Sequence, residues 1–193
     1  TGLPKAAKLS HSRFMGGGIY AALAGLRTDD VVYCPLPLYH TSGGVMCVNA
    51  VLRKGATLAL ARHFSASHFW EDVAYHKATT FQYIGELCRY LANMPPNPLE
   101  RSHGLRLAIG NGLRPDVWKT FHERFGVAQM VEFYGATESN AAMVNLAGRI
   151  GSVGLPFPGE KIALVKYDAE RMEIPRGADG FCQYSPPGQP GEL

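Results

Sequence analysis

A short segment, residues 132–138, combines the side chains that a nucleotide site needs. It reads Glu-Phe-Tyr-Gly-Ala-Thr-Glu and closes an apolar run. The ring of Tyr134 can stack on a purine, and Gly135 lets backbone approach a ligand. The hydroxyl of Thr137 can hydrogen-bond a phosphate oxygen, and the carboxylate of Glu138 can hold magnesium. The segment therefore suggests a nucleotide-binding turn, although a strand that ends in an ordinary glycine turn would have the same pattern.

Three further loops carry groups suited to a polyphosphate or a carboxylate ligand. Residues 1–5 read Thr-Gly-Leu-Pro-Lys, in which a hydroxyl, a flexible glycine and a lysine could surround phosphates, or form only a turn. They are not a Walker motif, because Lys5 follows a proline. Within residues 37–43, His40 is expected to end a strand and precede a glycine-rich helix start, although a lone histidine is more often structural. Residues 110–112, Gly-Asn-Gly, follow another expected strand.

Composition limits the class of protein and its partners. The 193 residues are 46% hydrophobic, enough for a globular core in one domain or two subdomains. A net charge of +3 is too small for a nucleic-acid-binding surface, so no nucleic-acid partner is expected. The four cysteines form no C-x-x-C pair, which fits a reducing, cytosolic setting, and the histidines have no metal-site spacing. No apolar stretch approaches the roughly 18 residues that a membrane-spanning helix needs.

Strands and helices alternate along the first 138 residues, which predicts an α/β fold with a mostly parallel sheet flanked by helices. One helix should be capped by Ser65 and bury Trp70, and a second should start at Pro115 and end at Gly126. Trp118 and Phe121 are expected in the core, whereas Lys8 and Arg13 are expected to be solvated surface. The expected strands cover residues 31–38, 56–61, 79–84, 105–109 and 129–133.

Ligands of parallel sheets collect at the carboxyl ends of the strands. The loops at 110–112 and 134–138 leave adjacent expected strands, so they should form one pocket rim. After residue 140, glycine and proline are frequent and bound short β stretches at 161–167 and 180–184. We therefore expect residues 1–140 to form an α/β subdomain, and residues 141–193 a truncated β-rich subdomain.

Taken together and in order, these loops resemble the adenylate-forming superfamily of acyl-CoA synthetases, luciferases and peptide-synthetase adenylation domains. The six matching segments are residues 1–5, 37–43, 110–112, 134–138, 151–156 and 190–193. Residues 64–70, 81–91 and 110–114 are similar to the fatty acid transport protein and very-long-chain acyl-CoA synthetase branch. The resemblance covers essentially the whole chain, and it implies the central part of the large N-terminal domain of such enzymes. It also implies that residues 1–140 are the nucleotide- and acyl-binding subdomain.

The resemblance implies a two-step ligase that uses ATP, magnesium and coenzyme A. A fatty carboxylate attacks the α-phosphate of ATP and releases pyrophosphate, and the thiol of coenzyme A then displaces AMP. The first step depends mainly on alignment and charge neutralisation, much of which magnesium supplies.

By the same resemblance, Glu138 would hold the metal and Thr137 would bond the α-phosphate. Tyr134 would stack on adenine, residues 110–112 would line the base with backbone, and His40 would lie near the reacting carboxylate. The implied catalytic residues are therefore Thr137, Glu138 and His40. The implied nucleotide-binding residues are Thr1, Gly2, Lys5, Gly110, Asn111, Gly112, Tyr134, Gly135, Ala136 and Thr137.

Part of the family pattern is missing from this sequence. The first half of the phosphate loop, a ribose-binding aspartate, the hinge and a C-terminal domain with a catalytic lysine are not found here. We therefore expect an internal fragment that is nearly inactive alone, from a parent that is cytoplasmic or peripheral on the cytoplasmic membrane face. Two alternatives remain: an adenylating ligase for an aryl, amino or bile acid, and a non-catalytic lipid carrier or interaction module. Retention of Thr137 and Glu138 argues against the second.

Overall fold

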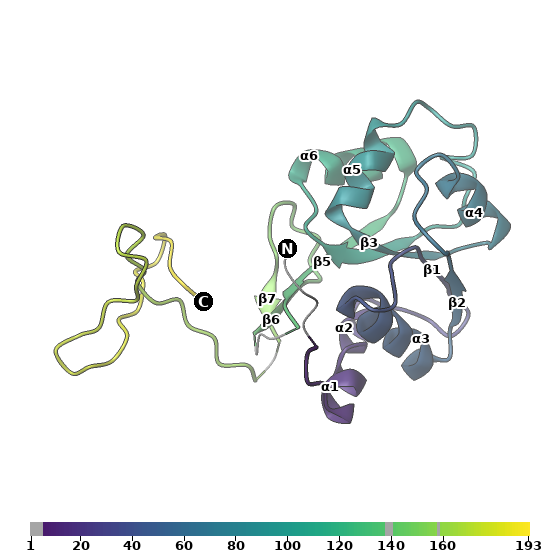
Figure 1. Cartoon of the computed structure of the whole chain (residues 1–193). Coiled ribbons are helices and arrows are strands. Elements are labelled where there is room, and N and C mark those ends of the chain that lie inside the picture. Colours follow the sequence, from purple (N-terminus) through teal and green to yellow (C-terminus); the bar gives the residue numbers. More distant parts are fainter. Residues whose placement is uncertain (1–5, 138–140, 158) are drawn as a thin grey trace. The chain divides into compact units, whose positions relative to one another are not determined.

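The computed structural model describes residues 6–137, 141–157 and 159–193. The chain divides into two compact units, Thr1–Leu155 and Pro156–Leu193. The predicted α/β class is confirmed, because the described strands form one mostly parallel sheet with helices packed against it (Figure 1). The subdomain boundary after residue 140 stays a prediction.

The sheet has the strand order β2-β1-β3-β4-β5-β6-β7. The strands are β1 (Val31–Cys34), β2 (Thr57–Leu60), β3 (Thr80–Ile84), β4 (Leu107–Asn111), β5 (Gln129–Gly135), β6 (Ala142–Asn145) and β7 (Leu155–Pro156). Strands β1 to β5 pair in parallel, and β6 runs antiparallel to β5. The carboxyl ends of β4 and β5 therefore lie side by side.

Two layers of helices cover the sheet. The α-helices are α1 (His11–Gly16), α2 (Ile19–Leu23), α3 (Val48–Lys54), α4 (Phe69–Tyr75), α5 (Gly85–Asn93) and α6 (Pro115–Thr120). Two π-helical segments, η1 (Thr41–Cys47) and η2 (Phe121–Phe125), precede α3 and extend α6. Helices α4, α5 and α6 lie on one face of the sheet, and α1, α2 and α3 lie on the other (Figure 1).

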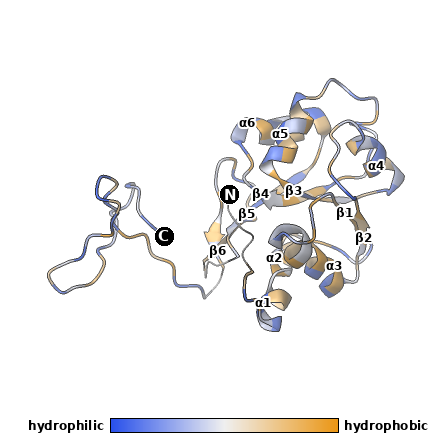
Figure 2. Ribbon diagram, in the orientation of Figure 1, coloured by the Kyte–Doolittle hydropathy of each residue, from blue (hydrophilic) through white to orange (hydrophobic). Residues whose placement is uncertain are grey.

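Aromatic side chains fill the layer between the sheet and α4 to α6. The ring of Phe69 packs edge-on against Trp70 and against Phe81 of β3, both at 4.8 Å between centroids. Trp118 and Phe121 are fully buried, which confirms their predicted place in the core. Figure 2 shows the hydrophobic colour running along β1 and β3. Each such side chain contributes about 1.5–3 kcal/mol when it is buried, so this layer is the main source of stability in the sheet unit.

Several predicted element boundaries differ from the structure. The strand expected over residues 31–38 ends at Cys34, because Pro35 and Pro37 lack the N–H group that a ladder needs. Ser65 does not cap α4, because the N-cap of this helix is His68. The Ser65 hydroxyl lies 3.1 Å from the Ser67 hydroxyl instead.

The helix that starts at Pro115 ends as predicted, at Gly126 in the left-handed conformation, with φ of 75°. Within unit Pro156–Leu193, the continuous strands expected at residues 161–167 and 180–184 are absent over the described residues. Isolated bridges join Val165 to Tyr184 and to Glu192.

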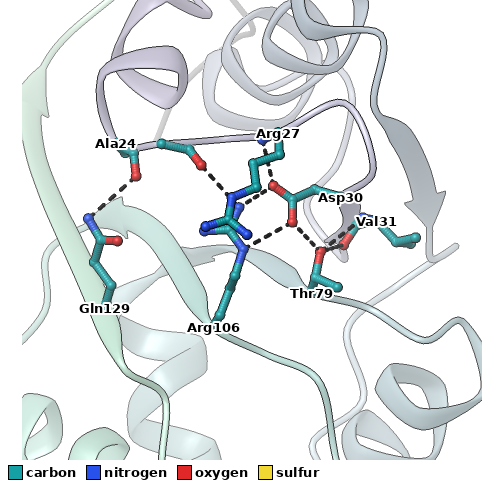
Figure 3. Close-up of polar contacts among 8 residues, drawn as sticks. Ala24, Arg27, Asp30, Val31, Thr79, Arg106 and Gln129 are labelled. Atoms are coloured by element: carbon teal, nitrogen blue, oxygen red, sulfur yellow. Dashed lines mark hydrogen bonds and ion pairs between the residues drawn. The ribbon is translucent and has the colours of Figure 1, made fainter.

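A polar cluster fastens the amino ends of the strands (Figure 3). Asp30, Thr79 and Arg106 immediately precede β1, β3 and β4. Thr79 donates to Asp30 Oδ1 at 2.6 Å, the Arg27 amide donates to Oδ2 at 2.6 Å, and the Arg106 guanidinium pairs with the same carboxylate. Burial raises the pKa of Asp30, but these bonds outweigh it and hold the pKa below its usual value. The polar groups at the amino ends of the strands therefore stabilise the fold. The candidate ligand-binding loops follow the carboxyl ends.

Candidate nucleotide-binding site

Two of the predicted loops meet at the carboxyl edge of the sheet. Strand β4 ends at Asn111 and β5 ends at Gly135, and their register pairs Gly110 with Glu132. The segments 110–112 and 134–137 therefore leave adjacent parallel strands in the same direction. Ligands of parallel sheets bind in this position.

Glycine is required at 110 by packing and at 112 by backbone conformation. A Cβ on Gly110 would overlap the carbonyl oxygen of Tyr83. Gly112 has φ of +78°, and its own carbonyl oxygen would overlap a Cβ on Gly85. Asn111 between them is half-buried. The turn after β4 therefore offers peptide groups, rather than side chains, to a flat ligand beside it.

The end of β5 changes abruptly from buried to exposed residues. Phe133 is 6% exposed and packs its ring 5.1 Å from that of Tyr20, whereas Tyr134 is 41% exposed. Gly135 and Ala136 are also exposed, and Thr137 is half-buried. An exposed aromatic ring at the end of a strand is available to stack on a base, as a core tyrosine is not.

Thr137 is held by two residues from distant parts of the sequence. Its hydroxyl oxygen lies 2.6 Å from the hydroxyl oxygen of Thr41, at the start of η1. Its carbonyl oxygen accepts a 2.8 Å hydrogen bond from the Arg13 guanidinium, which also reaches the carbonyl of Ala136 at 3.4 Å. Arg13 is exposed, as expected for a surface residue, but its guanidinium also holds the backbone of this loop.

His40 lies next to this contact but does not end a strand, because β1 ends six residues earlier. It is the N-cap of η1, and its Nδ1 accepts a 3.2 Å hydrogen bond from the Ser42 amide. The expected helix start after His40 is present. His40 is an exposed residue, and Nδ1 is the ring nitrogen that serves the cap.

A buried polar chain fixes the start of η1 against the sheet. Tyr20 donates to Gln82 Oε1 at 3.0 Å, and Gln82 Nε2 donates to the hydroxyl of Ser42 at 3.2 Å. Gln82 and Ser42 are 2% and 4% exposed. Buried polar groups with satisfied partners hold one geometry, so η1 begins at a fixed place.

Glu132 is a buried carboxylate directly behind the two loops, and sequence reasoning did not single it out beyond its place in the segment. It is 3% exposed. Oε1 accepts from the Leu113 amide at 3.0 Å, and Oε2 accepts from the Tyr83 hydroxyl at 2.7 Å. Burial raises the pKa of Glu132, and the hydrogen bonds oppose that rise. An acidic residue inside an otherwise apolar strand was the signal that could have identified it.

Some of the predicted site residues lie outside the described residues. These are Thr1, Gly2, Lys5 and Glu138. In the described part of the chain, no group of three His, Cys, Asp or Glu side chains could hold a metal ion. No described helix is both long and apolar enough to cross a membrane.

Known proteins are similar to this chain along its whole length. A family model described as AMP-binding enzyme matches residues 1–193. Long-chain fatty acid transport protein 3 of Homo sapiens is 46% identical over 200 residues, which cover all of this chain and 29% of that protein. Long-chain fatty acid transport protein 1 of Homo sapiens is also 46% identical and is covered to 31%. The chain thus spans about a third of the length of these relatives, and the resemblance to the fatty acid transport protein branch is confirmed.

Solved structures agree on the fold. A benzoate CoA ligase from Burkholderia xenovorans superimposes with a TM-score of 0.74 at 22% identity, over 93% of this chain and 36% of that one. The ATP-bound MatB from Rhodopseudomonas palustris has a TM-score of 0.70 at 26% identity, over 89% of this chain and 34% of its own. The edge with Tyr134 and Thr137 thus lies in a shared fold, and the chain belongs to the AMP-binding enzyme family.

Proposed function

We propose that this chain forms the nucleotide-binding core of an ATP-dependent ligase for long- or very-long-chain fatty acids. The carboxylate oxygen of the fatty acid attacks the α-phosphorus of ATP, the bond to pyrophosphate breaks, and an acyl-adenylate forms. The sulfur of coenzyme A then bonds the acyl carbon, AMP leaves, and the thiol proton passes to solvent. The observation that carries the proposal is the meeting of an exposed Tyr134, the backbone of residues 110–112 and the Thr137 hydroxyl at one edge of the sheet.

In this proposal the adenine ring stacks on Tyr134 and lies along the turn at residues 110–112. Exposure of the tyrosine ring and the positive φ of Gly112 support this placement, because together they give a flat ligand one aromatic and one peptide surface. The hydroxyl of Thr137 donates to an oxygen of the α-phosphate. The backbone of Gly135 and Ala136, both exposed, completes the contact.

His40 is proposed to lie beside the reacting carboxylate. Supporting this, the next residue along the chain, Thr41, touches Thr137 through its hydroxyl at 2.6 Å. His40 is therefore close in sequence to a direct neighbour of the proposed α-phosphate contact. Thr1, Gly2 and Lys5 are proposed to surround the β- and γ-phosphates on the basis of their family motif.

Magnesium in nucleotide sites is usually held by one or two carboxylates and by the phosphates themselves. A site of this kind needs only one carboxylate from the loop after β5, since the nucleotide supplies further oxygens. Glu138 is the proposed protein ligand. Magnesium, when bound, supplies neutralisation of the phosphate charge.

The proposed acid substrate follows from the relatives, which are long-chain fatty acid transport proteins at 46% identity. We propose that the whole protein acts in the cytoplasm or at the cytoplasmic face of a membrane, where fatty acids are available.

The test is acid-dependent release of pyrophosphate from ATP by the full-length protein that contains this chain. Long-chain fatty acids should support release better than aryl, amino or bile acids. Glu138→Ala should lower the rate by about tenfold or more, because the metal loses its protein ligand. A preference for amino or aryl acids would assign another adenylating ligase, and the absence of acid-dependent release would favour a non-catalytic carrier. An unchanged rate in Glu138→Ala would contradict the proposed role of Glu138 as the metal ligand.

A further inference from the structure

The hydroxyl groups of Thr41 and Thr137 face each other at 2.6 Å, although 96 residues separate them in sequence. Both side chains are half-buried at the edge described above. Either oxygen can be the donor, because a hydroxyl carries one proton and two lone pairs. The contact therefore leaves one of the two protons free to bond something else.

Thr41 is fixed by its surroundings. It is the first residue of η1, directly after the N-cap His40. Tight packing holds the next turn of this segment, since a Cβ on Gly44 would overlap the carbonyl oxygen of Leu38. The adjacent Ser42 is bonded to Gln82 of β3. Thr41 thus gives the loop after β5 a rigid reference point on another element.

The backbone of Thr137 is held independently by Arg13 of α1, which donates to its carbonyl oxygen at 2.8 Å. With the backbone fixed there, the remaining freedom of Thr137 is rotation of its side chain and of its hydroxyl proton. The contact with Thr41 restricts rotation of the side chain. The direction of the hydroxyl proton depends on which acceptor lies nearby.

We propose that Thr41 is a positioning residue for adenylation: it donates its proton to Thr137 Oγ1, so that the Thr137 hydroxyl points its own proton at the α-phosphate. This inference rests on the proposed function. An ionised phosphate oxygen can only accept, so a bound nucleotide selects the arrangement in which Thr137 donates to the phosphate and Thr41 donates to Thr137. Preorganised donors of this kind lower the barrier because they need no reorientation during the reaction.

The test compares Thr41→Val, which keeps the shape and removes the hydroxyl, with Thr41→Ser, which keeps the hydroxyl. Steady-state pyrophosphate release by the full-length protein gives kcat and the KM for ATP. Loss of one aligning hydrogen bond should lower kcat/KM by about tenfold in Thr41→Val. Thr41→Ser should stay within about threefold of wild type, because it keeps the donor. Thr57→Val, on the exposed edge strand β2, is the matched control and should leave both constants unchanged.

A double-variant cycle separates positioning from general damage. If Thr41 acts through Thr137, the change Thr41→Val should cost little further activity in a Thr137→Val background. Should Thr41→Val fail to fold, as judged by its melting temperature, Thr41→Ala replaces it in the same cycle.

The outcomes distinguish this inference from the function it rests on. A wild-type protein that releases no pyrophosphate with any carboxylic acid overturns both. An active wild type overturns the inference alone if Thr41→Val matches it, if Thr41→Ser falls as far as Thr41→Val, or if the losses in the cycle simply add.

Discussion

Replacing Tyr83 with phenylalanine should weaken the support behind the loop at residues 110–112. The Tyr83 hydroxyl has one proton and two acceptors within reach, Glu132 Oε2 at 2.7 Å and the Val131 carbonyl at 3.2 Å. The shorter bond to the carboxylate takes the proton. Glu132 in turn holds the Leu113 amide, so the hydroxyl supports the turn through the carboxylate.

The magnitude follows from burial. Glu132 is 3% exposed, so water cannot replace the lost donor, and a hydrogen bond to a charged group contributes about 1.5–3 kcal/mol. Tyr33→Phe is the matched control, because the Tyr33 hydroxyl also donates to a carboxylate at 2.7 Å, that of Asp72. Asp72 is only half-buried, so a water molecule can replace the lost hydroxyl donor. The expected loss of stability in Tyr33→Phe is therefore below about 1 kcal/mol.

Hydrogen exchange of the full-length protein measures the effect locally, by mass spectrometry of peptides that contain β3, β5 and Leu113. Tyr83→Phe should speed exchange by about tenfold to a hundredfold, since each 1.4 kcal/mol is about tenfold. The cost should shrink at a pH low enough to protonate Glu132, because a neutral carboxyl needs its donors less. The reasoning from burial would be refuted if Tyr83→Phe and Tyr33→Phe changed the exchange rates equally. It would also be refuted if Tyr83→Phe changed them by less than about threefold.

Three further substitutions test other contacts of the sheet unit. Gly85→Ala should raise the KM for ATP and lower the melting temperature, because its Cβ would overlap the Gly112 carbonyl oxygen; Gly16→Ala, with nothing within 4 Å, should do neither. Arg13→Ala should raise the KM for ATP by about three- to tenfold in pyrophosphate-release assays, because the Thr137 carbonyl loses its donor. The pKa of Asp30 is held low, so its ionised form stabilises the fold fully above the unfolded pKa, about 3.9, and that stability is lost as pH falls through the folded value. Asp30→Asn should therefore reduce the acid dependence of the melting temperature between about pH 3 and 5, and an unchanged profile would contradict this.

The sequence predicted the alternation of strands and helices well, because buried strands and amphipathic helices have distinct periods. The helix from Pro115 to Gly126 was correct at both ends, since proline and glycine mark those positions by backbone geometry alone. Ser65 was a wrong cap because capping depends on where the chain turns, and the helix begins four residues later. The strand pattern after residue 160 failed because short β stretches need partners that local sequence does not specify.

The site was predictable only in part. Motif residues such as Tyr134 and Thr137 could be named from their types and spacing. Arg13, Thr41 and Glu132 could not be given their contacts, because those contacts join residues that lie from 19 to 124 positions apart in the chain. Such pairings depend on the order of strands in the sheet, which the motifs do not encode.

A crystal structure of the full-length protein with a non-reactive acyl-adenylate analogue tests the central claim most directly. We predict that the adenine ring stacks on Tyr134 beside residues 110–112, with a phosphate-equivalent oxygen within hydrogen-bond distance of the Thr137 hydroxyl. An adenine ring bound away from the carboxyl ends of β4 and β5 would contradict the account.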